Sequence, residues 1–122
     1  MYTIRVKTMC SHDKVGGWSA IINKKVISGG CVNTTANRME LTALIEAIKT
    51  ISPRGTNNIV QLVGVSKWLR NAMSSFRTYQ EYTRQRGVTG KLLTLGGHEL
   101  ANQDLWNELI ILARAKNVKI IY

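Results

Sequence analysis

The chain has 122 residues, 44% apolar and 20% charged, with one proline and no run of about 18 consecutive apolar residues. These values indicate a single globular domain over residues 1–122 and exclude a membrane span. Seventeen Lys and Arg against seven Asp and Glu give a net charge of +10, so we expect a polyanion, above all nucleic acid, as the partner of this basic protein. The alternative is that the excess charge only keeps the protein in solution.

The N-terminus and the cysteines favour a cytoplasmic location. The first residues, MYTIRVKT, alternate as in a strand and lack the apolar run of a signal peptide. Cys10 and Cys31 are too few for a disulfide framework. We expect both to be reduced thiols that act as small apolar residues at strand ends.

The first third of the chain has the pattern of β-structure. Residues 2–9 alternate along the chain, and two further β-rich runs, 18–22 and 26–32, surround the sequence Asn-Lys-Lys at 23–25. This arrangement predicts an antiparallel three-stranded meander.

A helix and a buried strand are predicted next. Thr34 or Thr35 offers a hydroxyl N-cap, and apolar residues then recur at helical spacing up to Ile51. The apolar run IVQLV, 59–63, is typical of a buried central strand, and Ser66 can cap the helix that follows it. A strand, a helix and a strand in this order imply a parallel pair of strands joined by a crossover.

The second half of the chain is predicted to be mainly helical. The pattern stays helical over 67–86, with one apolar face and one basic face. Residues 87–101 carry four glycines and predict an extended loop. Asn102 is then expected to cap a helix that reaches Leu112, and 118–122 to form a last strand.

Four short stretches, in this order, resemble the type 1 ribonuclease H family over nearly the whole chain. They are GGWSAI at 16–21, TTANRMEL at 34–41, SKWL at 66–69 and NQDLW at 102–106, and NRMEL is the most specific of them. The resemblance implies an α/β fold, a five-stranded mixed sheet with an antiparallel meander and then parallel strands, flanked by helices. The family's terminal helix is expected to be missing, because the sequence ends at Tyr122.

The activity implied by the resemblance is hydrolysis of the RNA strand of an RNA–DNA hybrid by two divalent cations, which converging carboxylates must hold. Carried over by position, the family's three strand and helix carboxylates fall on Lys7, Glu40 and Val65, so that only Glu40 is retained. The last Asp of the family would lie beyond the end of this sequence. We therefore expect no catalytic residue and no metal site, and Mg²⁺ would be needed only if a rearranged site on Glu40 survives.

Lys7 suggests a hypothesis about this altered site. Its ammonium group would take the place of the metal charge and pair with Glu40, or contact a nucleic-acid phosphate directly. The alternative is that the first strand is shifted in register by one residue, which would leave Lys7 solvated.

A basic and aromatic region between Lys67 and Lys91 resembles the helix and loop with which many ribonucleases H grip the hybrid. The resemblance also places Thr35 and Asn102 in a phosphate pocket, and Asn37 toward the minor groove. The residues expected to bind nucleic acid are Lys67, Arg70, Asn71, Arg77, Arg84, Arg86, Lys91, Thr35, Asn37 and Asn102.

Three functions remain open at this point. The first is a catalytically inactive ribonuclease H-like protein, a pseudoenzyme, that binds RNA, an RNA–DNA hybrid or a single strand. The second is a divergent metal-dependent ribonuclease H that cleaves RNA in hybrids. The third is a protein-interaction or assembly module, with self-association or a protein partner at the C-terminal side, where apolar surface would be exposed.

Overall fold

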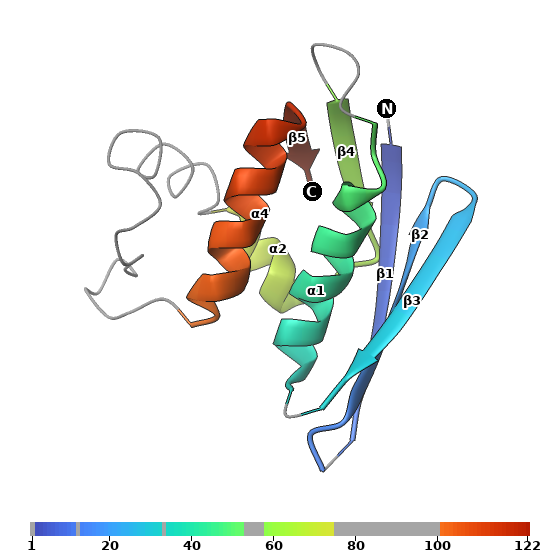
Figure 1. Ribbon diagram of the computed structural model, residues 1–122, viewed down its shortest axis with the longest axis vertical. Helices are drawn as coiled ribbons and strands as arrows, with labels where there is room; N and C mark the ends of the chain where they lie inside the picture. Colours follow the sequence, from blue (N-terminus) through green and yellow to red (C-terminus); the bar gives the residue numbers. More distant parts are fainter. Residues whose placement is uncertain (1, 12, 33, 53–57, 75–100) are drawn as a thin grey trace.

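The fold is one five-stranded mixed sheet with helices packed against it (Figure 1). The computed structural model describes residues 2–11, 13–32, 34–52, 58–74 and 101–122. Among these residues, no helix is long and apolar enough to cross a membrane. The architecture confirms the α/β, ribonuclease H-like fold that the sequence predicts.

The strands follow the predicted order, with an antiparallel meander and then parallel pairs. The sheet has the order β3-β2-β1-β4-β5, in which β1 pairs with β4, and β4 with β5, in parallel. The elements are β1 (Tyr2–Cys10), β2 (Gly16–Ile22), β3 (Lys25–Cys31), α1 (Ala36–Lys49), β4 (Asn58–Val63), α2 (Lys67–Met73), α4 (Gln103–Ala115) and β5 (Val118–Ile121). Cys10 and Cys31 are free thiols at the ends of β1 and β3, as expected.

The helix caps were predicted in two cases out of three. The Thr35 hydroxyl accepts a hydrogen bond from the Arg38 amide, and the Ser66 hydroxyl accepts one from the Leu69 amide. Asn102 does not cap α4 through its side chain, because its backbone is left-handed, with φ of 61°. The prediction of one continuous helix over 67–86 is also wrong, because α2 ends at Met73. Residues 75–86 of that prediction lie outside the described residues.

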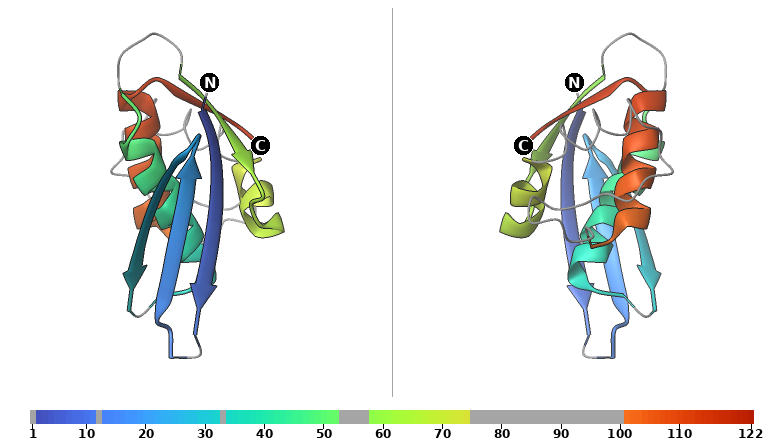
Figure 2. Two further views of the ribbon diagram at one scale, coloured as in Figure 1. Left: turned by 90° about the vertical axis from the view of Figure 1, so that its right-hand side faces the viewer. Right: turned by 90° about the vertical axis from the view of Figure 1, so that its left-hand side faces the viewer.

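The described helices α1 and α4 cover one face of the sheet, and no helix among the described residues lies on the other face (Figure 2). Side chains alternate between the two faces of a strand, and on β1 Ile4 and Val6 are buried against the helices while Arg5 and Lys7 are exposed. We call the opposite side the open face, since no described helix covers it. By the strand registers, it is formed by Thr3, Arg5, Lys7, Met9, Gly17, Ser19, Ile21, Val26, Ser28, Gly30, Ile59, Gln61, Val63, Lys119 and Ile121.

Polar contacts hold the last helix to the end of the first. The Lys116 ammonium donates to the carbonyl oxygens of Lys49 and Ile51, each at 2.6 Å. Carbonyls in the last turn of a helix have no partner within the helix. A cation at this end is also attracted by the partial negative charge of the helix dipole. Lys116 therefore anchors the C-terminal end of α4 on that of α1, which fixes the relative position of the two helices that carry much of the candidate site.

Candidate nucleic-acid interface

Glu40 lies in the first turns of α1 and its carboxylate is bonded to Ser66. The residue is 6% exposed. Its Oε2 accepts from the Ser66 amide at 2.9 Å and its Oε1 accepts from the Ser66 hydroxyl at 2.5 Å. The same hydroxyl accepts from the Leu69 amide and so caps α2. Both oxygens of Glu40 thus hold the beginning of α2 against α1, a contact that the sequence pattern did not reveal.

The described residues around Glu40 do not fit a two-cation site. Two divalent cations need several oxygen ligands that converge on one point. No group of three His, Cys, Asp or Glu side chains in the described ranges could hold a metal ion. Of the four described acids other than Glu40, three form ion pairs, namely Asp104 with Arg38, and Glu46 and Glu108 with Lys49. The fourth, Asp13, lies in the turn between β1 and β2.

Lys7 and Val65, the other two positions on which the resemblance places a metal ligand of the family, both lie in the described part of the chain. Lys7 is exposed on the open face, whereas α1 with Glu40 packs against the opposite face, so the hypothesis that Lys7 pairs with Glu40 is wrong. Alternation along β1 places Thr8, not Lys7, on the helix side of the sheet. Val65 is half-buried and packs against the apolar core just before Ser66.

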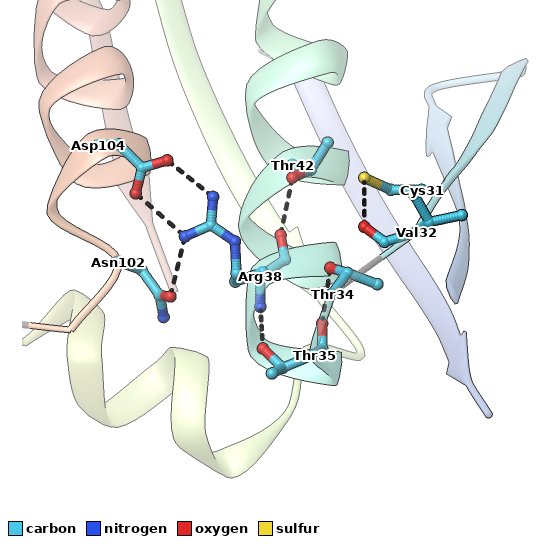
Figure 3. Close-up of polar contacts among 8 residues, drawn as sticks. All are labelled: Cys31, Val32, Thr34, Thr35, Arg38, Thr42, Asn102 and Asp104. Carbon is cyan, nitrogen blue, oxygen red and sulfur yellow. Dashed lines mark hydrogen bonds and ion pairs between the residues drawn. The ribbon is translucent and has the colours of Figure 1, made fainter. Parts of the chain in front are cut away.

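Arg38 joins the beginning of α1 to that of α4 (Figure 3). Its guanidinium donates to both carboxylate oxygens of Asp104, at 3.0 and 2.7 Å, and to the Asn102 amide oxygen at 3.2 Å. A bidentate arginine–carboxylate pair fixes both the distance between the two side chains and their relative orientation. Asn102 is therefore positioned by Arg38, and the sequence did not single out Arg38 or Asp104 because 66 residues separate them.

This ion pair shifts the protonation of both partners. The hydrogen bond from Arg38, together with its positive charge, lowers the pKa of Asp104 below its usual value. In return, the hydrogen bond to Asp104 raises the pKa of Arg38. The pair is thus fully ionised at neutral pH.

We expect Asp104→Asn to lower the free energy of unfolding at neutral pH by about 0.5–1 kcal/mol, a small value because the Asp104 side chain is 63% exposed. Since the pKa of Asp104 is lower in the folded state, its contribution is present above the unfolded pKa of about 3.9 and is lost as the pH falls through the folded pKa. Urea denaturation of both proteins should therefore show a difference that disappears once the pH lies below the folded pKa of Asp104. A difference that persists there would mean that Asp104 acts through packing rather than charge.

The described binding residues gather where α1, α2 and α4 begin. Thr35 caps α1, Glu40 connects α1 to the cap of α2, and Arg38 connects α1 to Asn102 at the start of α4. Four further predicted residues are exposed on this side, namely Asn37, Lys67, Arg70 and Asn71. The predicted residues Arg77, Arg84, Arg86 and Lys91 lie outside the described residues.

Comparisons with known proteins give one family. The sequence profile of the RNase H family matches residues 8–122. The ribonuclease H of Syntrophomonas wolfei is 33% identical over 109 residues, which cover 86% of this chain and 69% of the relative. For the ribonuclease H of Thiobacillus denitrificans the identity is 32%, with 84% of this chain and 66% of the relative covered. The ribonuclease H of Hahella chejuensis is 36% identical, with 77% of this chain and 60% of the relative covered. This chain, which spans about two thirds of the length of these relatives, belongs to the ribonuclease H family.

Proposed function

We propose that this domain binds RNA or an RNA–DNA hybrid and does not cleave it by two-metal chemistry. The observation that carries the proposal is the state of Glu40, whose two carboxylate oxygens are bonded to Ser66. A cation at this point would have to displace the two bonds by which Glu40 holds Ser66, the cap residue of α2. Among the described residues, no group of three His, Cys, Asp or Glu side chains that could hold such a cation is found.

Binding would use the surface where the three helices begin. Unpaired backbone amides at a helix N-terminus attract anions, and here Thr35, the N-cap of α1, and Asn37 in its first turn are exposed. Arg38 in the same turn binds Asn102. The Asn102 amide oxygen accepts a hydrogen bond from Arg38. The NH₂ group of the same amide can therefore donate to a phosphate. Lys67 and Arg70 on α2 add two exposed cations. Contacts of this kind give affinity that depends on charge and not on base sequence.

The second candidate function is a ribonuclease H that cleaves the RNA strand of a hybrid. The names of the relatives favour it, since proteins 32 to 36% identical to this chain are ribonucleases H. It would require carboxylates besides Glu40 from outside the described residues. The two candidates differ in one measurable property, the cleavage of a hybrid in the presence of Mg²⁺ or Mn²⁺.

The experiment that separates them follows binding and cleavage in the same samples. A fluorescein-labelled RNA–DNA hybrid is titrated with the protein at several salt concentrations with Mg²⁺ or Mn²⁺, and binding is read by anisotropy and cleavage on a gel. We expect binding without cleavage, and Lys67→Ala with Arg70→Ala should reduce the slope of log K against log salt by about 1.4–1.8, since each lost phosphate contact removes about 0.7–0.9.

The matched control is the pair Lys24→Ala and Lys25→Ala, which removes the same charge from the β2–β3 turn and the first residue of β3, away from the beginnings of the helices (Figure 1). This pair should change the slope much less. Cleavage by the wild type that is lost in Glu40→Gln would establish the enzyme instead. A protein that neither binds nor cleaves nucleic acid, but elutes as an oligomer, would favour the assembly function.

A further inference from the structure

The open face is basic and carries no acid. Arg5 and Lys7 lie two residues apart on β1, and Lys119 lies on β5. None of the fifteen residues that form the open face is Asp or Glu, whereas the described acids Glu46, Asp104 and Glu108 all make their ion pairs on the helices. Within the described ranges, the three cations of the open face form no ion pair. This arrangement favours an anionic ligand.

Two paired glycines leave the backbone of the open face bare. Gly17 on β2 lies beside Gly30 on β3. Glycine weakens a strand, so its presence there calls for a reason. On the other face the reason is packing, because a Cβ at Gly16 would lie 2.8 Å from Thr34, and one at Gly29 would lie 2.7 Å from the Trp18 ring.

At Gly17 the described part of the chain provides no such reason. A Cβ there would meet only the Gly29 carbonyl oxygen, at an ordinary 3.8 Å, and Gly17 is not among the residues with positive φ. The fold would thus accept a side chain at this position. In strands, a glycine that neither packing nor φ requires often marks a place where a ligand approaches the backbone.

A hollow lies at the same place. It is shallow and wide open to solvent, and it is lined by Lys7, Thr8, Met9, Gly17, Trp18 and Ser19. Four of these six, Lys7, Met9, Gly17 and Ser19, belong to the open face by the strand register. The hollow therefore combines a bare backbone floor, a flexible thioether, a hydroxyl and an ammonium group.

We propose that the open face binds a single strand of nucleic acid, with one base against Gly17 in the hollow and neighbouring phosphates on Lys7 and Arg5. Residues two apart in a strand are about 6.8 Å apart, an interval suited to successive phosphates of an extended strand. A single strand offers an unpaired base and phosphates together, whereas a duplex keeps its bases stacked inside. Met9 can fit its thioether to the base, and Ser19 can hydrogen-bond with the base edge.

This site is separate from the interface proposed above, because α1 and α4 lie on the other side of the sheet (Figure 2). The two proposals can therefore fail independently. The protein could hold a hybrid at the beginnings of its helices and a single strand on its open face. Such a pair of sites suits a protein that acts where a duplex meets an unpaired strand.

The test uses fluorescein-labelled oligouridine and the full chain, with the RNA–DNA hybrid measured in parallel. Gly17→Val fills the hollow with a side chain that strands favour, and it should weaken oligouridine binding at least about fivefold while hybrid binding stays unchanged. Lys7→Gln and Arg5→Gln should each reduce the salt slope for oligouridine by about 0.7. Lys67→Ala with Arg70→Ala should mainly affect the hybrid.

Thermal melting followed by circular dichroism checks that each variant is folded, and the exposed Lys7→Gln change provides the test if Gly17→Val is not. Unchanged oligouridine affinity in the folded variants would overturn the proposal. It would also be overturned if Gly17→Val weakened the hybrid and oligouridine equally, since there would then be one site. Displacement of oligouridine by polyglutamate, with no effect of Gly17→Val, would show that the face accepts an acidic protein instead.

Discussion

Replacing Glu40 with alanine is expected to lower the free energy of unfolding by about 2–3 kcal/mol, because two hydrogen bonds to a buried carboxylate are lost at once. Glu40→Gln keeps the shape and one acceptor oxygen, so about 1 kcal/mol should be lost. Urea denaturation followed by circular dichroism measures both values. A metal-ligand carboxylate without such partners would give the opposite result. Its replacement by a neutral amide would raise the free energy of unfolding of the metal-free protein.

Glu46→Ala is the matched control on the same helix. Glu46 is half-exposed and pairs with Lys49 at 3.0 Å, so its removal should cost less than about 0.5 kcal/mol. A double-mutant cycle with Ser66→Ala should give a coupling energy of about 1 kcal/mol or more between Glu40 and Ser66. If Glu40→Gln instead stabilised the protein, and Mn²⁺ raised the melting temperature of the wild type alone, Glu40 would be a metal ligand and the proposed function would be wrong.

Trp106→Ala is expected to have a still larger effect, a loss of about 3–5 kcal/mol. Trp106 on α4 is 1% exposed and its ring centroid lies 6.4 Å from that of Trp68 on α2. The side chain thus fills the space between the two helices that begin at the candidate interface. A loss of this size is a large part of the 5–15 kcal/mol by which a domain is usually stable.

Trp106→Phe should cost much less than Trp106→Ala, because most of the ring volume remains. Ile111→Ala is the control on the same helix, and since Ile111 is 51% exposed its cost should stay below about 1 kcal/mol. All three free energies come from urea denaturation. Equal losses for Trp106→Ala and Ile111→Ala would mean that α4 is not held by this core contact. For Trp106→Ala we also expect weaker hybrid binding, because α2 carries Lys67 and Arg70.

Most of the fold could be predicted, because its signals are local in the chain. The alternation of β1, the helical spacing of α1 and the hydroxyl caps at Thr35 and Ser66 all depend on residues a few positions apart. Asn102 shows the limit of such signals, since it has the residue type of an N-cap but not the backbone conformation. A left-handed residue with its side chain bonded to Arg38 depends on where α1 lies, which local sequence does not specify.

The sequence by itself determined the family, the order of the described strands and helices, and the basic charge, because each of these is a property of residue types and their spacing. Only the tertiary structure showed that Glu40 holds Ser66, that Arg38 holds Asp104, and that Lys7 faces away from both helices. The first two contacts join residues 26 and 66 positions apart. The third depends on strand register, in which a shift of one residue moves a side chain to the other face of the sheet.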